Sequence, residues 1–531
     1  MKRSYRILLS VLSGVLLSLA WLGFPGWTLF FAFLPLLYLD HFFVEQKNNF
    51  RGVSFWGHAF LAFLIWNVLT TFWVANATLA GALMAFIINS FLMAGVWWLA
   101  HTARRNFKLN LGYFALIVFW ISFEYLHYHW DFEWPWLHLG NGFANNIKMV
   151  QWYEFTGVFG GTFWVLIMNI LLFKILLNYK NKLSLKNAIY PISTFIILLI
   201  VPFSISLILY YSYVEKENPK NITIVQPNVD PYSESYDLEA ETQKMRTFMT
   251  LAESVTTDET DFIIGPETVF ENPGYWNEAE LQSNRFYNNF LRMINNYSNT
   301  EIIFGVSSFK VYPDKNTAPL SARVNGESAY DRFNTAVFIE RSGQSQIYHK
   351  SKLVVGVEKM PFMKYLGFLS DIVINIGGTT GSLGRQTEPS NFVSKDGTQV
   401  APVICYESIF GEYVTGYIQK GAELIFIITN DGWWKNTPGY KQHLSFASLR
   451  AIETRRSIAR AANTGISCFI NQRGDISQPT NWWVETAING TINANDKITF
   501  YVKYGDYIAR VSLFVSVLLL LNLVVKRFTK R

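Results

Sequence analysis

Cysteine is almost absent from this sequence. Only Cys405 and Cys468 occur among the 531 residues. Two cysteines cannot form the several bridges that hold a disulfide-rich domain together, so that class of protein is excluded. We expect both thiols to stay reduced, and a free thiol in an exported domain would indicate a chemical use for it.

Charged residues are also scarce, at 16% of the chain, whereas hydrophobic residues make up 50% and aromatic residues 17%. The formal net charge of +6 does not indicate a nucleic-acid partner, because the polar region has no basic stripe interleaved with aromatic residues. A soluble enzyme usually has a smaller hydrophobic share. The composition therefore favours a membrane protein.

Long hydrophobic runs fill the chain up to Tyr211 and return near its end. A helix needs about 20 apolar residues to cross a hydrocarbon core about 30 Å thick. Eight segments meet this need: Ile7–Leu22, Trp27–Val44, Ser54–Val74, Thr78–Ala100, Gly112–Tyr128, Gly157–Leu177, Ile189–Tyr211 and Tyr507–Val525. The first resembles a secretory signal, but no small-x-small cleavage site follows it, so we expect it to remain as a span.

Lysine and arginine cluster in alternate connections between these spans, as they do in the short cytoplasmic connections of membrane proteins. The clusters are Lys2 and Arg3; Lys47 and Arg51; Arg104, Arg105 and Lys108; Lys180, Lys182 and Lys186; and Lys526, Arg527, Lys530 and Arg531. We therefore expect a multi-pass protein of a bacterial inner membrane with both termini in the cytoplasm. The polar segment before the last span then lies on the periplasmic side.

The chain thus divides into helices at residues 1–211, a polar domain at 212–506, and a last helix with its tail at 507–531. The outer connection His129–Thr156 contains four tryptophans, which usually lie at the membrane interface; a docking role for a lipid substrate is the alternative. Glu124 is costly in lipid and should face the bundle interior, a cavity or the interface.

The polar domain alternates short β-rich runs with helical stretches, which predicts an α/β layered fold. Predicted strands are Ile222–Val225, Phe262–Gly265, Ile302–Val306, Ala336–Ile339, Val403–Ile404, Leu424–Thr429 and Ser467–Ile470. Predicted helices are Glu239–Val255, Glu278–Asn296 and Tyr440–Ala461.

Three apolar runs of this domain end in polar residues that a buried strand does not need: Glu267, Lys350 and Cys405. A cysteine is a strong nucleophile once a base removes its proton, and Glu267 can serve as that base. Lys350 can hold the thiolate and then the oxyanion of a tetrahedral intermediate. Each residue alone has an ordinary structural explanation, so the hypothesis depends on all three occurring together.

Several motifs surround these residues: Trp134-Pro135-Trp136, Val225-Gln226-Pro227-Asn228, Pro266-Glu267-Thr268, Arg332-Phe333-Asn334-Thr335, Tyr348-x-Lys350, Cys405-Tyr406-Glu407 and Thr429-Asn430-Asp431-Gly432-Trp433. Together with the span count they resemble the apolipoprotein N-acyltransferase family of the carbon–nitrogen hydrolase, or nitrilase, superfamily. The resemblance covers almost the whole chain. It implies a membrane helical bundle joined to an αββα sandwich domain.

The resemblance also implies roles for individual residues. Glu267 would be the base, Lys350 the electrostatic stabiliser and Cys405 the nucleophile. The supporting or substrate-binding positions would be Asn334, Glu358, Tyr406, Glu407 and Trp433. The sequence departs from the family at Gly265-Pro266-Glu267, where Trp-Pro-Glu is usual, and at Val355-Gly356-Val357-Glu358, where Pro-Phe-Gly-Glu is usual. The first departure predicts a looser cavity wall near the base.

The implied reaction transfers a fatty acyl group from a membrane phospholipid, through a Cys405 thioester, to the N-terminal amine of a diacylglyceryl apolipoprotein. The enzyme would act as a monomer, without nucleic acid. No metal or organic cofactor is expected, because His349 and His443 have no Cys or His at ligand spacing.

Three other functions remain open. A membrane-anchored amidase or nitrilase acting on a small C–N substrate would use the same three residues, although one span would suffice as an anchor. A thiol protease or transglutaminase would pair Cys405 with His443. A transporter or ligand receptor would need several charged residues inside the spans, where Glu124, Lys174 and Arg510 are found.

Overall fold

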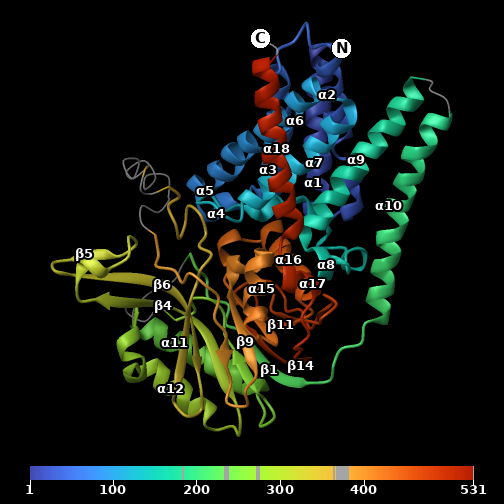
Figure 1. Cartoon of the computed structure of the whole chain (residues 1–531). Helices are drawn as coiled ribbons and strands as arrows, with labels where there is room; N and C mark the ends of the chain where they lie inside the picture. Colours follow the sequence, from blue (N-terminus) through green and yellow to red (C-terminus); the bar gives the residue numbers. More distant parts are fainter. Residues whose placement is uncertain (182–184, 233–237, 271–274, 363–364, 366–381, 530–531) are drawn as a thin grey trace. The chain divides into compact units, whose positions relative to one another are not determined.

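The computed structural model describes residues 1–181, 185–232, 238–270, 275–362, 365 and 382–529. Lys182, Lys530 and Arg531 of the predicted basic clusters lie outside these residues. The chain forms two compact units (Figure 1). The helical unit comprises Met1–Ala75, Leu79–Ser212 and Tyr504–Arg531, and the sheet unit comprises Asn76–Thr78 and Tyr213–Lys503.

Apolar helices make up the helical unit, as the hydrophobic runs predict. The long ones are α1 (Arg3–Ser18), α2 (Leu34–Glu45), α3 (Val53–Thr71), α6 (Asn89–Asn106), α7 (Leu109–Leu126), α9 (Val158–Lys180), α10 (Leu185–Ser212) and α18 (Tyr507–Thr529). Short helical turns lengthen three of them, so that seven apolar segments of the described chain are long enough to cross a membrane. An eighth, Asn110–Leu126, is shorter. The predicted membrane helical bundle is confirmed.

Buried polar groups hold this bundle together. Glu124 of α7 lies in the bundle interior, where its carboxylate accepts hydrogen bonds from Trp120 Nε1 at 2.9 Å, the Leu139 amide at 2.8 Å and the Thr162 hydroxyl at 2.6 Å. Leu139 belongs to the tryptophan-rich connection. In that connection Trp136 is 1% exposed, so its side chain packs inside the helical unit.

Two sheets with helices on their outer faces make up the sheet unit (Figure 1). The first has the strand order β14-β1-β2-β4-β6-β5, with β3 added to β4 and β7 added to β6; the second has the order β13-β12-β11-β10-β9-β8. The strands of the first sheet are β1 (Pro219–Gln226), β2 (Phe262–Ile264), β3 (Trp276–Asn277), β4 (Glu301–Tyr312), β5 (Arg323–Asn325), β6 (Ser328–Ile339), β7 (Ser345–His349) and β14 (Thr486–Asn493). Those of the second are β8 (Phe392–Val393), β9 (Gln399–Ile404), β10 (Leu424–Thr429), β11 (Ser457–Ala462), β12 (Cys468–Ile470) and β13 (Ile476–Ser477).

Alternation along the strands explains the layers. Ile263 of β2 packs with Phe248 and Phe290, which belong to α11 (Leu238–Val255) and α12 (Arg285–Ile294). Its neighbour Phe262 points to the other face and meets Phe426 of the second sheet, with ring centroids 5.3 Å apart. The second sheet is covered by α15 (Gly411–Gln419) and α16 (Pro438–Thr454). The predicted αββα sandwich is confirmed.

One predicted element is wrong. The helix predicted over Tyr440–Ala461 ends at Thr454, and Ser457–Ala462 forms the central strand β11 instead. Arg455 stops the helix, because its backbone is left-handed with φ of 50°. The alanines of this segment favour a helix locally, but pairing on both sides with β10 and β12 overrides that preference.

The direction of the strands places several chain segments at one edge. β1, β2 and β4 are parallel, as are β9, β10 and β11. β6 is antiparallel to β4, and β7 is antiparallel to β6, so β7 runs the same way as β4. The segments that follow β2, β7, β9 and β10 therefore leave their sheets at the carboxyl ends, which is where α/β folds commonly place a site.

Candidate active site

The three predicted catalytic residues follow three of these strands. Glu267 comes three residues after β2, Lys350 directly after β7, and Cys405 directly after β9. All three line one cavity of about 270 Å³, which we call the catalytic cavity. They are 6%, 1% and 6% exposed, so their charges interact in surroundings from which water is largely excluded.

Lys350 stands between two carboxylates. Its Nζ donates to Glu267 Oε1 at 2.8 Å and to Glu358 Oε1 at 2.9 Å. Burial alone would lower the pKa of Lys350, but Glu267, Glu358 and the nearby Cys405 hold that pKa well above its usual value. Lys350 is therefore a fixed positive charge at neutral pH.

Asn334 of β6 fixes the same two carboxylates. Its Nδ2 donates to Glu267 Oε1 at 2.8 Å and to Glu358 Oε1 at 2.9 Å. The second oxygens accept from main-chain amides: Asn430 N reaches Glu267 Oε2 at 3.0 Å, and Val354 N reaches Glu358 Oε2 at 2.8 Å. Each of the four carboxylate oxygens is thus held by a donor, which orients Glu267 within the catalytic cavity.

Cys405 adopts a backbone conformation that is rare for a residue with a side chain. Its φ is 48°, a left-handed value that costs roughly 1–3 kcal/mol and persists only where neighbouring contacts hold it. Burial raises the pKa of the Cys405 thiol well above its usual value; Glu267 and Asp431 raise it too, and Lys350 and a hydrogen bond with Thr429 act against them. The resting thiol is protonated and needs a base.

Glu407 connects the Cys405 segment to the Lys350 segment. Its carboxylate accepts from the Ile404 amide at 2.8 Å, the Ser351 amide at 2.6 Å and the Tyr348 hydroxyl at 2.6 Å. Because these donors flank Cys405 and Lys350 in the chain, Glu407 supports the relative positions of both residues. It does so from outside the catalytic cavity.

The other two predicted supporting residues differ in position. Trp433 lines the catalytic cavity and is 40% exposed. Tyr406 is not among the described residues that line it; its ring is buried against Phe410, with centroids 5.3 Å apart. The structure therefore brings Glu267, Lys350 and Cys405 together with Asn334, Glu358 and Trp433, and it places Tyr406 and Glu407 behind the wall of the catalytic cavity.

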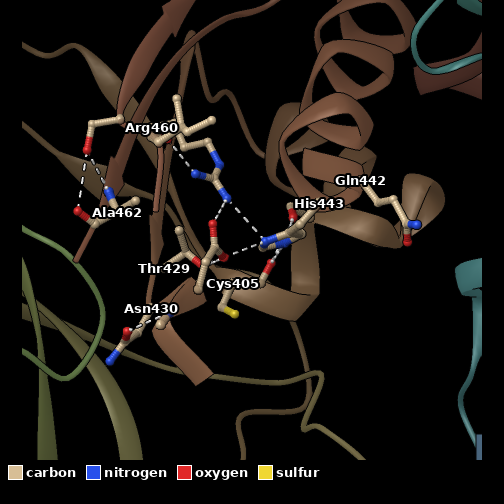
Figure 2. Close-up of polar contacts among 12 residues, drawn as sticks. Cys405, Thr429, Asn430, Gln442, His443, Arg460 and Ala462 are labelled. Carbon is tan, nitrogen blue, oxygen red and sulfur yellow. Dashed lines mark hydrogen bonds and ion pairs between the residues drawn. The ribbon is translucent and has the colours of Figure 1, made fainter. Parts of the chain in front are cut away.

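A buried network behind Cys405 was not predicted as part of the site (Figure 2). His443 Nε2 lies 3.2 Å from the Cys405 carbonyl oxygen, and His443 Nδ1 lies 3.0 Å from Asp431 Oδ1. Arg460 donates to Asp431 Oδ2 at 2.7 Å, and the Ser408 hydroxyl donates to the Cys405 carbonyl at 2.7 Å. These contacts hold the main chain at the strained position of the thiol.

This network occupies both ring nitrogens of His443. The ring nitrogens of His443 face the Cys405 main chain and Asp431, so their geometry gives no support to His443 as the base of a thiol protease. Burial raises the pKa of Asp431, but Arg460 and His443 outweigh that effect and hold it well below its usual range. Arg460 was not predicted as a site residue, because it lies in β11, which the sequence predicts as helix.

The space around Gly265 is closely packed. A Cβ added there would lie 2.7 Å from the Phe248 ring and 3.0 Å from Phe304 Cβ, so these aromatic side chains already fill the space. Neither ring is among the described residues that line the catalytic cavity, so the looser wall stays a prediction. Val357, from the second departure, lines the catalytic cavity beside Glu358.

The described residues include no group of three or more His, Cys, Asp or Glu side chains placed to hold a metal ion. The expectation of an enzyme without a cofactor stays a prediction. What the site contains is a thiol, a fixed ammonium and an oriented carboxylate, which together suit nucleophilic attack on a carbonyl group.

Comparisons with known proteins agree with this chemistry. Residues 221–498 match the family model of carbon-nitrogen hydrolases, and residues 13–171 match that of the apolipoprotein N-acyltransferase N-terminal domain. The chain is 28% identical to an apolipoprotein N-acyltransferase of Chlorobaculum tepidum, over 98% of this chain and 96% of the relative. It is 26% identical to the one of Thermotoga maritima, over 96% and 92%.

Some solved structures are also similar to part of the chain. A nitrilase-superfamily protein of Saccharomyces cerevisiae is 16% identical, with a TM-score of 0.37 over 53% of this chain and 93% of its own. An amidase of Nesterenkonia is 13% identical, with a TM-score of 0.36 over 56% of this chain and 99% of its own.

Proposed function

We propose that Cys405 carries the transferred acyl group in this chain, which belongs to the carbon–nitrogen hydrolase family and is an acyltransferase of lipoprotein N-acylation. The donor is a membrane phospholipid, and the acceptor is the N-terminal amine of a diacylglyceryl apolipoprotein. The observation that carries this proposal is the catalytic cavity, in which Glu267 and Lys350 flank the Cys405 thiol.

The first half of the reaction acylates Cys405. Glu267 takes the thiol proton, and the sulfur attacks the ester carbonyl of the phospholipid. Lys350 stabilises the thiolate and then the oxyanion of the tetrahedral intermediate, since a fixed charge is most effective where water is excluded. The ester C–O bond breaks, the lysophospholipid oxygen takes the proton from Glu267, and the acyl group remains as a thioester.

The second half transfers the acyl group to nitrogen. The free amine of the acceptor attacks the thioester carbonyl, and Glu267 accepts a proton from that nitrogen. The C–S bond then breaks, an amide forms, and the proton returns to Cys405. The apolar part of the catalytic cavity wall, which includes Trp433, Trp434 and Leu383, suits a hydrocarbon chain.

An anchored amidase would use the same triad, but it would not need the helical unit. The seven long apolar segments and the match of residues 13–171 support an enzyme whose substrates are themselves held in the membrane. We accordingly assign residues 1–211 and 507–531 to the membrane and residues 212–506 to the catalytic domain.

We also propose that both termini lie in the cytoplasm and that the catalytic domain lies on the periplasmic side. Lys47, Arg51, Arg105 and Lys526 come from three different predicted cytoplasmic segments, yet they line one cavity of about 730 Å³ within the helical unit. The start of α1 and the end of α18 lie at the same end of that unit (Figure 1). Both observations support one cytoplasmic side for these segments.

The test is the covalent intermediate. Full-length protein mixed with phospholipid, without an amine acceptor, should carry a fatty-acyl mass on the peptide containing Cys405, and hydroxylamine should remove it. Cys405→Ala should abolish both the adduct and acyl transfer.

Cys468 provides the matched control. It is fully buried in β12, and burial raises the pKa of its thiol to about 12. Cys468→Ala should keep the adduct and full transfer, at a stability cost of about 1 kcal/mol. If no adduct forms on Cys405, or if Cys405→Ala still transfers acyl groups, the covalent mechanism is wrong.

A further inference from the structure

The sheet face that carries Asn334 continues beyond the catalytic cavity. In the β4–β6 ladder Ser307 pairs with Asn334, Phe309 with Arg332, and Val311 with Tyr330. Residues two apart in a strand share a face, so these three pairs form one strip. The first pair lines the catalytic cavity, and the next two pairs line a second cavity of about 360 Å³, which we call the Arg332 cavity.

One side chain belongs to both cavities. Tyr275 lines the catalytic cavity and the Arg332 cavity, which therefore adjoin. The Arg332 guanidinium lies over the Tyr275 ring, 4.5 Å from its centroid, and its terminal nitrogen contacts the Tyr275 hydroxyl at 3.4 Å. It also lies 5.7 Å from the centroid of Tyr330.

The charge of Arg332 is not neutralised within its cavity. Among the residues that the structure describes, none of the ion pairs includes Arg332, and its Nε is buried without a hydrogen-bond partner. The other side chains that line the cavity are neutral. A planar guanidinium held against an aromatic ring, with donors still to be satisfied, is suited to bind the oxygens of a phosphate group.

We propose that the Arg332 cavity binds the phosphate of the phospholipid acyl donor. This rests on the proposed function. The distance along the strand fits, because residues two apart are separated by about 7 Å, and the glycerol backbone places the phosphate only a few covalent bonds from the ester carbonyl. An ester beside Asn334 thus brings its phosphate to Arg332.

The proposal also orients the donor. The acyl chain lies along the apolar wall at Trp433 and Trp434, and the head group extends the other way, toward Tyr330 and the polar residues Asn325 and Ser328. After the C–S bond has formed, the lysophospholipid is retained only by the Arg332 cavity. The acceptor amine then reaches the thioester once this product has left.

The experiment measures the first half-reaction of the full-length enzyme in detergent micelles, without an acceptor. Two donors with the same acyl chain are compared: a phospholipid, and a p-nitrophenyl ester, which has no phosphate. The yield of acyl-Cys405 is followed by mass spectrometry as a function of donor concentration for wild type, Arg332→Gln, Arg332→Lys and Lys310→Gln.

Lys310 is the matched control, because it follows Phe309 in β4 and points to the opposite face of the sheet. Loss of a charge-assisted bidentate contact should raise the apparent KM for phospholipid about 10-fold to 100-fold in Arg332→Gln. Arg332→Lys should fall between this variant and wild type, and Lys310→Gln should equal wild type. Acylation by the p-nitrophenyl ester should be unchanged in all variants, which also shows that they are folded.

Four results would overturn the inference. Equal losses of acylation with both donors would show that Arg332 has a structural role. An unchanged KM for phospholipid would show that the Arg332 cavity does not bind the phosphate. Normal acylation of Cys405, with a loss that appears only when lipoprotein acceptor is then added to the acylated enzyme, would assign the cavity to that acceptor. Competition by inorganic phosphate at concentrations similar to the lipid would assign it to the free ion. Failure of wild-type Cys405 to acylate with any donor would instead refute the proposed function itself.

Discussion

Replacing Lys350 by methionine tests the charge balance of the catalytic cavity. Lys350 Nζ lies within 2.9 Å of one oxygen from each of Glu267 and Glu358. Methionine leaves those two carboxylates facing each other with only Asn334 between them. At a separation of about 5 Å and an effective dielectric constant of about 20, their repulsion is about 3 kcal/mol. Breaking a buried ion pair from one side typically costs about 3–5 kcal/mol.

A double-mutant cycle separates this repulsion from lost packing. Glu358→Gln in the Lys350→Met background removes one of the two charges, so it should restore most of the lost stability. The thermal unfolding midpoint of the purified full-length protein, followed by tryptophan fluorescence, should fall by roughly 10 °C in Lys350→Met and by less in the double variant.

Activity should not follow stability in this cycle. Both variants lack the ammonium that stabilises the oxyanion, so acyl transfer should stay about 10²-fold to 10³-fold below wild type even where the fold is restored. Near-normal transfer by Lys350→Met would show that the oxyanion is stabilised by another group. A double variant no more stable than Lys350→Met would refute the electrostatic explanation of the loss.

Three further predictions concern other parts of the chain. Glu267→Gln keeps the shape of the base but cannot accept a proton, so turnover should fall by about two to four orders of magnitude; near-normal turnover would exclude Glu267 as the base. Burial raises the pKa of Glu301, at the start of β4, to about 7. The folded state therefore retains that proton after the unfolded chain has lost it, and stability falls as the pH rises from about 4.5 to about 7. Glu301→Gln removes this pH dependence of stability, so the unfolding midpoint of the variant should exceed that of wild type at pH 8 but not at pH 4, with transfer activity unchanged. Equal midpoints at pH 8 would contradict the raised pKa of Glu301. A reporter that is active only outside the cytoplasm should work when fused after Tyr213 and fail when fused after Arg531, and activity of both fusions would mean that one predicted span is wrong.

Hydrophobic pattern alone predicted much of the fold. All seven predicted strands overlap observed ones, since each is a short apolar run bounded by polar residues. β11 was missed because its alanines favour a helix, and β14 was missed because Thr486–Asn493 is mostly half-exposed and lacks a strong apolar run. Local pattern cannot show that β14 pairs with β1, which lies far earlier in the chain.

The site residues that directly follow the end of an apolar strand could be predicted from the sequence. Glu267, Lys350 and Cys405 drew notice as polar residues after apolar runs, and the structure places them in one cavity. The network of Asp431, His443 and Arg460 gave only partial signals, because its role depends on contact with a main-chain carbonyl that no side-chain pattern reveals. The same limit applies to the Arg332 cavity, which becomes visible only through the register of β4 and β6.

The pairing of β1 with β14 has a consequence for how the protein is made. Pro219 lies opposite Asn493, so one edge of the first sheet stays open until almost the whole catalytic domain has been synthesised. Such distant pairing is slow to form, and an open strand edge invites mispairing with other chains. Only a short segment separates β14 from α18, so the last helix leaves the ribosome soon after the strand that completes the sheet. We expect a nascent chain that stops before Thr486 to remain protease-sensitive and one that reaches Lys503 to become resistant.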